Sequence, residues 1–181
     1  MKDQAAATRY ARALFEVSLD SGDVDRTEGD LAAFQGLVDG HPTLARALLN
    51  PAIPPSRKRA VVTAILDRIP ETAPAVRRLL RMLAERDRLG LLPALIEAYG
   101  DALLDHRQIV RARVTTAEPL ETGRIASITR TLEAATGRPV RIETSVDAGL
   151  VGGMVTQIGG TVFDGSLVHH LDSLRQRFIT A

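Results

Sequence analysis

The sequence predicts an α+β fold, with an N-terminal six-helix antiparallel bundle followed by a small C-terminal α/β domain that has a short sheet and a terminal helix. Up to about His106 the apolar residues recur at helical spacing, and the breaks between helical segments are short, which is typical of antiparallel neighbours. After His106 apolar and polar residues alternate, as in half-buried strands. This change of period predicts two domains, residues 1–106 and residues 107–181.

The first expected helix has two apolar stripes. One consists of Ala6, Tyr10, Ala13 and Val17, and the other of Ala7, Ala11 and Leu14. A helix at the edge of a bundle needs only one stripe to cover the core. The second stripe therefore indicates either a central position in the bundle or a surface that receives an amphipathic partner helix.

Five further helices are expected before His106. Pro42 suits the first turn of the third, prolines interrupt the chain at residues 50–56, and Ser56 is the expected N-cap of the fourth. The fifth carries apolar residues over a wide arc. The apolar positions of the second to sixth helices are Leu31, Phe34 and Val38; Leu44, Leu48 and Leu49; Val61, Val62, Ile65 and Leu66, expected to face inward; Leu79, Leu80, Met82 and Leu83; and Leu92, Leu95, Ile96, Tyr99 and Leu103.

The second domain should contain strands near residues 110–116 and 140–146, separated by a helix that ends at Gly137. Gly159-Gly160 is expected to be a two-residue hairpin turn between strands at 154–158 and 161–163. Asp164-Gly165 is then a tight turn, and Ser166 caps a terminal helix. The apolar positions of that last helix are Leu167, Leu171, Leu174 and Phe178.

Composition excludes several classes of protein. The chain has 181 residues, a formal net charge of +1 and no cysteine, so a disulfide framework and thiolate metal sites are excluded. Fourteen basic and fifteen acidic residues precede His106, and nine and seven follow it. Neither half has the basic excess that a nucleic-acid partner requires. No apolar run reaches membrane-spanning length, and the start lacks the layout of a secretory signal.

The sequence contains only weak signals for a catalytic or metal site. The stretch from Gly160 to Ser166 has the spacing of a phosphate-binding loop, but Ser166 stands where the lysine is needed and Asp164 would repel a phosphate. His169 and His170 are adjacent, about 100° apart on a helix, which is poor geometry for one metal ion. We therefore expect no catalytic residue, no metal and no cofactor.

Two groups of basic residues are expected to be solvated or to contact a partner. The run Arg57-Lys58-Arg59 lies early in the fourth helix, where positive charge opposes the helix dipole and suggests an acidic neighbour. The other group, on the fifth helix, consists of Arg77, Arg78 and Arg81.

Several motifs in a fixed order resemble the delta subunit of F-type ATP synthases, called oligomycin-sensitivity-conferring protein in mitochondria. They begin with YARALFEV at residues 10–17, NPAIP at 50–54, and LGLLP at 89–93 with Tyr99. They continue with VTTAEPL at residues 114–120, GGMV at 152–155 and IGGTVFDGS at 158–166. The resemblance covers essentially the whole chain.

This resemblance implies a non-catalytic stator subunit that ties the catalytic head to the peripheral stalk, so that rotor torque drives ATP synthesis coupled to proton transport. The implied partners are the alpha subunits of the head, with the beta subunits as a further candidate, and the b-type stalk subunits. The implied location is the cytoplasmic face of the bacterial inner membrane, with membrane association only through the complex.

The resemblance also implies two contact sites. A groove between the first and fifth helices would receive the N-terminal helix of an alpha subunit, and its residues are Tyr10, Ala13, Leu14, Val17, Leu79, Met82 and Leu83. The stalk contact would use Met154, Val155, Ile158, Leu167 and Leu171. Gly160 and the segment Val168-His169-His170 depart from the family pattern near this second site.

Two other functions are compatible with parts of the sequence. A nucleotide-handling enzyme would use the glycine stretch and would bind labelled ATP stoichiometrically. A general helical adaptor would use the same apolar stripes but would not co-purify with ATP synthase subunits.

Overall fold

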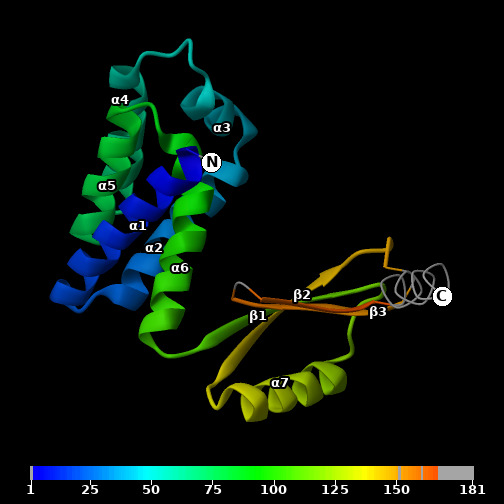
Figure 1. Cartoon of the computed structure of the whole chain (residues 1–181). Coiled ribbons are helices and arrows are strands. Elements are labelled where there is room, and N and C mark those ends of the chain that lie inside the picture. The colour runs from blue at the N-terminus through cyan, green and yellow to red at the C-terminus, as the bar shows by residue number, and fades with distance from the viewer. Residues whose placement is uncertain (1, 151, 160, 167–181) are drawn as a thin grey trace, which may run out of the picture. The chain divides into compact units, whose positions relative to one another are not determined.

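The computed structural model describes residues 2–150, 152–159 and 161–166, which form a mixed fold of helices and a small sheet, as the sequence predicts. The chain divides into two compact units, residues 1–103 and residues 104–181. Figure 1 shows the helices of the first unit and the sheet with its helix in the second. The helices before the sheet are α1 (Lys2–Ser21), α2 (Val24–Asp39), α3 (Pro42–Leu49), α4 (Pro55–Arg68), α5 (Pro74–Glu85) and α6 (Leu92–His106), with the short 3-10 helix η1 (Leu89–Leu91) before α6.

The core of the first unit is built mainly from aliphatic residues around one buried tyrosine. Tyr99 is fully buried, its hydroxyl donates a hydrogen bond to the Val24 carbonyl at 3.0 Å, and its ring meets Phe15 edge-on at 5.5 Å between centroids. Ser18 and Thr27 are also fully buried and are hydrogen-bonded to each other at 3.0 Å, which links α1 to α2. Tyr99 thus contacts both helices that enclose this polar link.

Only one of the two stripes on α1 packs into the core. Ala7, Ala11 and Leu14 are buried, whereas Val17 is 52% exposed and Ala13 is also at the surface. Neighbouring positions on a helix point about 100° apart, so a stripe that includes Ala11 leaves the stripe of Tyr10 on the flank of the helix. Of the second stripe, Tyr10 still packs partly against the core, whereas Ala13 and Val17 remain outside it.

Proline starts three of the helices. Pro42, Pro55 and Pro74 occupy the first turn of α3, α4 and α5. The prediction that Ser56 caps α4 is wrong, because α4 begins at Pro55, Ser56 is its second residue, and no side chain caps it. Proline has no N–H and its fixed φ suits the first helical position, so Pro55 leaves one fewer unsatisfied backbone donor at the start of α4.

The basic run on α4 is not uniformly solvated, contrary to the prediction. Lys58 is only 1% exposed and forms an ion pair with Asp87, which follows α5. Arg59 pairs with Glu85 at 2.8 Å. A buried ammonium is costly unless it is paired. The acidic neighbour suggested by the unfavourable dipole position is therefore supplied by the end of α5.

Arg77 is also not simply solvent-facing. Its guanidinium donates to the backbone carbonyls of Leu66 and Ile69 and to the carboxylate of Asp67, 2.9 Å away. These are the carbonyls at the C-terminal end of α4, which lack partners within the helix. Arg77 therefore caps α4 from α5. Arg81 lies 3.7 Å from the same Asp67 carboxylate.

The second unit is a four-stranded sheet with one described helix. Its elements are β1 (Val110–Thr116), α7 (Thr122–Thr136), β2 (Val140–Val146), β3 (Gly153–Ile158) and β4 (Thr161–Ser166). The strand order is β2-β1-β3-β4, with β1 and β2 parallel and the other pairs antiparallel. Parallel strands need a long crossover, and α7 provides it.

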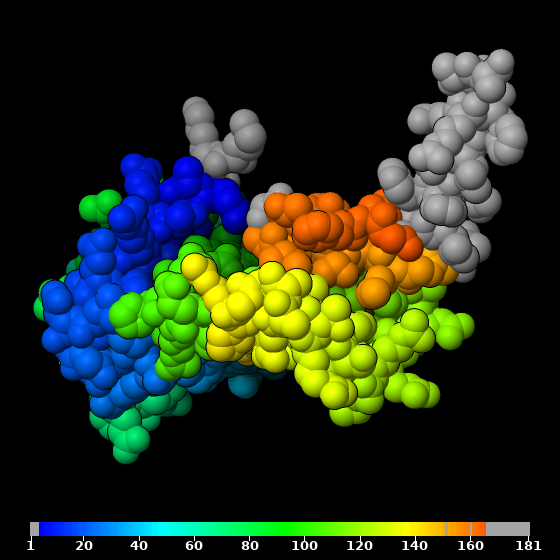
Figure 2. Space-filling model, turned by 60° about the horizontal axis from the view of Figure 1, so that its bottom comes forward, coloured from blue at the N-terminus to red at the C-terminus, as the bar shows by residue number. Residues whose placement is uncertain are grey.

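The two faces of this sheet differ in character. One face carries the buried side chains of Ala112, Val114 and Thr116, and α7 contacts β2 on that side. The opposite face is mostly polar, with Glu143 paired to Arg111 at 3.3 Å, and it also carries Val155 and Val162. In Figure 2 α7 (yellow) lies in front of the sheet, and the β3–β4 hairpin (orange) is exposed beside it.

The glycine-rich stretch forms the predicted hairpin but not the predicted turn at Asp164-Gly165. Gly159 has φ +56 in the two-residue connection between β3 and β4, as expected for such a turn. Asp164-Gly165 is not a turn, because β4 continues to Ser166, which pairs with Gly153. A Cβ at Gly165 would lie 3.2 Å from the Met154 carbonyl oxygen, so glycine suits this close pairing. The predicted terminal helix, with its histidines, lies outside the described residues.

Candidate docking surface

The residues predicted to form a groove between α1 and α5 divide into a buried and an accessible group. α1 and α5 contact each other, and Leu14, Leu79 and Leu83 lie within the core beneath them. The accessible group consists of Tyr10 and Met82, which are half-buried, with Ala13 and Val17, which are exposed. We call these four residues the α1–α5 surface. The three leucines are buried beneath this surface in the free chain.

The geometry of each helix explains why these side chains gather at the surface. Tyr10, Ala13 and Val17 follow one another at spacings of three and four residues, so they share one flank of α1. On α5 the row at four-residue spacing consists of Arg78 and Met82, and it continues to Arg86, the residue directly after the helix. A partner helix lying along this surface would meet an apolar strip from α1 and a mixed apolar and basic strip from α5.

Two arginines that sequence reasoning did not select lie at one end of the α1–α5 surface. Nη1 of Arg88 is 3.1 Å from the Tyr10 hydroxyl oxygen, and Nη1 of Arg86 is 3.5 Å from it, so both donate to the phenol. Burial raises the pKa of Tyr10, but the hydrogen bonds and positive charges of Arg88 and Arg86 together outweigh it and lower that pKa. The sequence signal for this cluster was the Arg-Asp-Arg tripeptide directly after α5.

The chain has two tyrosines, and we expect them to titrate on opposite sides of pH 10. Burial raises the pKa of Tyr99, and hydrogen bonds involving Ser18 and Thr27 oppose this only in part. Because the folded-state pKa of Tyr99 is raised, the stability that depends on its protonated form is complete below pH 10 and is lost as the pH rises through that pKa. Phenolate absorbance should therefore show two transitions, the later one coupled to unfolding.

A matched variant assigns the earlier transition. Arg88→Gln should shift it to higher pH, because one donor to the Tyr10 oxygen loses its charge, and should leave the later transition unchanged. One transition involving both tyrosines at the same pH would contradict the arrangement.

The residues predicted for the stalk contact are not all on one face of the sheet. Met154 and Ile158 lie on the same face of β3, and Val155 points to the other, because successive residues of a strand alternate. Met154 is 38% exposed and Phe163 of β4 is 57% exposed, and cross-strand register places both on one face. Leu167 and Leu171 lie outside the described residues.

A hollow of about 690 Å³ opens beside Met154. Its other walls are the loop from Thr116 to α7 and the ends of β3 and β4. Glu118, Glu121 and Arg124 give it a mixed charge. This end of the sheet therefore combines exposed apolar side chains with a polar recess.

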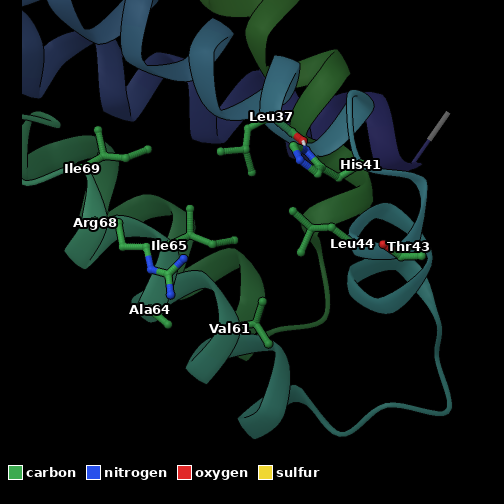
Figure 3. Close-up of a pocket in the computed structure, with 9 residues that line it drawn as sticks. All are labelled: Leu37, His41, Thr43, Leu44, Val61, Ala64, Ile65, Arg68 and Ile69. Carbon is green, nitrogen blue, oxygen red and sulfur yellow. Dashed lines mark hydrogen bonds between the residues drawn. The ribbon is translucent and has the colours of Figure 1, made fainter.

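A second hollow, mostly apolar and about 450 Å³ in volume, lies among α2, α3 and α4. Figure 3 shows Leu37, Leu44, Val61 and Ile65 around it. Val61 was expected to face the core with Val62 and Leu66, but it is partly exposed on the rim of this hollow. Val61 is next to Val62 in sequence, so it is rotated about 100° away from that fully buried residue.

The described residues do not form a nucleotide or metal site of the kinds considered from the sequence. The segment Thr161–Ser166 is a strand paired to β3, so it is not a loop that cradles phosphates. In the described part of the chain, no group of three or more His, Asp or Glu side chains is placed to hold a metal ion. No helix among those residues is long and apolar enough to cross a membrane.

Comparison with known sequences gives a consistent result along the chain. A family model described as ATP synthase delta (OSCP) subunit matches residues 6–178. The ATP synthase subunit delta of Citrifermentans bemidjiense is 35% identical over 92% of each chain. The ATP synthase subunit delta of Anaeromyxobacter dehalogenans (strain 2CP-C) is 37% identical over 94% of each chain.

Comparison with solved structures shows the same fold in larger assemblies. A chain of the Toxoplasma gondii mitochondrial ATP synthase hexamer matches with a TM-score of 0.72 and 24% identity, over 96% of this chain and 97% of that chain. A chain in the F1 head and rotor region of Polytomella F-ATP synthase matches with a TM-score of 0.53 and 21% identity. That second match covers 56% of this chain and 88% of the other.

Proposed function

This chain belongs to the ATP synthase delta (OSCP) subunit family, and we propose that it joins the catalytic head to the peripheral stalk through a separate surface on each of its two units. It is a structural, non-catalytic stator subunit of an F-type ATP synthase. In this proposal residues 1–106, the first domain predicted from the sequence, act as a six-helix antiparallel bundle that binds the N-terminal helix of an alpha subunit. Residues 107–181, the second predicted domain, bind the b-type stalk subunits.

The observation that carries the head contact is the second apolar stripe of α1. Val17 and Ala13 remain exposed although the core of the unit is complete without them. An amphipathic helix laid along α1 and α5 would cover both, together with the accessible parts of Tyr10 and Met82. Four such side chains form a strip of the kind that helix-in-groove recognition uses.

The energetics favour a modest affinity for an isolated partner helix. Complete burial of a Val- or Met-sized side chain contributes about 1.5–3 kcal/mol, and the half-buried residues contribute less. Association costs about 4–15 kcal/mol before net affinity appears. Micromolar binding of the peptide, about 8 kcal/mol net, therefore requires contacts in addition to these four side chains.

Binding through both units at once slows dissociation of the chain from the head and the stalk. When both units are engaged, rebinding of either one is intramolecular, so the assembled joint dissociates more slowly than either contact alone. A stator needs this slow dissociation under load rather than any chemistry.

For the stalk contact the supporting observation is the β3–β4 hairpin. Met154 and Phe163 expose apolar surface on one face of it, and β4 is one of the two edge strands of the described sheet. The proposed contact set is that of the sequence prediction, Met154, Val155, Ile158, Leu167 and Leu171, with Phe163 added. The assembled subunit would lie at the cytoplasmic face of the bacterial plasma membrane and be held there only through the complex.

The head contact is tested by titrating the full chain into a labelled peptide of the alpha-subunit N-terminal segment and following fluorescence anisotropy. We expect saturable one-to-one binding with a micromolar or lower Kd. An absence of binding at micromolar concentrations would overturn the proposed head contact, even when the chain is fully folded.

A further inference from the structure

The tripeptide Arg86-Asp87-Arg88 looks self-neutralising in sequence, but the structure separates its charges. Asp87 pairs with the buried Lys58 of α4, and its neighbour Glu85 pairs with Arg59 of the same helix. Both acidic side chains of this segment are therefore directed toward α4. Arg86 and Arg88 are directed the other way, toward α1.

Arg86 and Arg88 share one neutral acceptor. Both donate to the Tyr10 hydroxyl oxygen, and within residues 2–150, 152–159 and 161–166 neither guanidinium has a carboxylate at ion-pair distance. Both arginines are exposed, so the cluster is open to a partner. Two positive charges that converge on one phenol oxygen repel each other, and a carboxylate placed between them would relieve that repulsion.

Asp87 cannot easily provide this carboxylate. If it turned toward the arginines, the ammonium of Lys58, which is 1% exposed, would be left buried without its partner. A buried charge that loses its partner is strongly destabilising. The core of the bundle thus holds Asp87 in place, and the positive cluster beside Tyr10 is a lasting property of the folded chain.

We propose that Arg86, Arg88 and the Tyr10 hydroxyl form a carboxylate-binding site at the end of the α1–α5 surface, and that it pairs with an acidic side chain of the docked amphipathic helix. This inference rests on the proposed head contact and adds the chemistry of the partner. Guanidinium groups form strong, directional hydrogen bonds with carboxylates. The apolar strip provides the burial, while the carboxylate fixes the register and direction of the partner.

The spacing of residues along α1 predicts where this carboxylate lies along the partner helix. Tyr10 and Val17 are seven residues apart, which is about 10.5 Å along the helix axis. A partner helix lying parallel or antiparallel to α1 should therefore carry its acidic residue about two turns from the apolar residue that covers Val17.

The test compares two peptides and three proteins by calorimetric titration. The peptides are the alpha-subunit N-terminal segment and the same segment with every Asp and Glu changed to Asn and Gln. The proteins are the full wild-type chain, Arg88→Gln, and Arg57→Gln as a matched control, because Arg57 is an exposed arginine on α4.

For the wild-type chain we expect the amide peptide to bind about tenfold more weakly than the carboxylate peptide, the scale of a charged hydrogen bond. Arg88→Gln should lose about the same factor for the carboxylate peptide and almost nothing for the amide peptide, whereas Arg57→Gln should match wild type. Equal affinity of the wild-type chain for both peptides would overturn the carboxylate site but not the head contact. Failure of both peptides to bind wild type would overturn the head contact itself.

Discussion

Val17→Asp is expected to weaken binding of the alpha-subunit N-terminal peptide by at least about 100-fold, with a change in unfolding free energy of no more than about 0.5 kcal/mol. Val17 is 52% exposed, so an aspartate there is solvated in the free chain. In the complex the same carboxylate would be covered by apolar surface. Desolvation at about 2 kcal/mol or more, added to about 1 kcal/mol of lost apolar burial, corresponds to a factor of about 100.

Leu19→Asp is the matched control for this variant. Leu19 is 37% exposed on the same helix, and two residues of separation place it about 200° around the helix from Val17. It therefore lies on the flank of α1 away from the α1–α5 surface. Its peptide affinity should stay within about twofold of wild type, a difference of about 0.4 kcal/mol. Equal losses in both variants, or no loss in Val17→Asp, would contradict the assignment of this flank.

Tyr99→Ala is expected to lower the unfolding free energy of the helical unit by about 3–5 kcal/mol. The side chain is fully buried, and its removal leaves a cavity beside Phe15 and deprives the Val24 carbonyl of its donor. This loss is a large part of the stability of a typical domain, about 5–15 kcal/mol. Equilibrium urea unfolding of the full chain, followed by circular dichroism, measures it.

Tyr99→Phe separates the packing from the hydrogen bond. It keeps the ring and its edge-on contact with Phe15 but removes the donor to Val24, so we expect a loss of about 1–2 kcal/mol. Similar losses for Tyr99→Ala and Tyr99→Phe would show that the hydroxyl, rather than the ring, dominates the contribution of Tyr99. A loss below about 1 kcal/mol for Tyr99→Ala would contradict its central place in the core.

Features set by local spacing could be predicted from the sequence. The change of apolar period near His106 indicated the α+β class. Gly159-Gly160 indicated the hairpin, because few other pairs adopt its turn so readily. The two apolar stripes of α1 indicated a second apolar flank on this helix. Spacing alone could not decide whether the bundle itself or a partner would cover that flank.

Features set by pairing between distant segments could not be predicted. Lys58 is buried only because Asp87, 29 residues later, turns toward it with a positive φ of 53°. The same turn directs Arg86 and Arg88 toward Tyr10, which is more than 70 residues away in sequence. β4 continues through Asp164 and Gly165 because β3 is beside it to complete the pairing.

The burial of three of the predicted groove residues also depends on contacts between distant segments. Leu14, Leu79 and Leu83 have apolar spacing that suits either a core or a surface, and only the packing of α1 on α5 shows them to be beneath the surface. The accessible residues Tyr10, Ala13, Val17 and Met82 are those that remain for a partner. The proposed head contact therefore has four accessible side chains instead of the seven that the sequence suggested.

The most direct test of the head contact is photo-cross-linking in the assembled ATP synthase, with a photoreactive amino acid at position 17 and, separately, at position 19. If the α1–α5 surface receives the alpha-subunit N-terminal helix, illumination of the position 17 variant should link this chain to that N-terminal segment, and position 19 should give no such product. A product of position 17 with a stalk subunit, or the same alpha-subunit product from both positions, would contradict it.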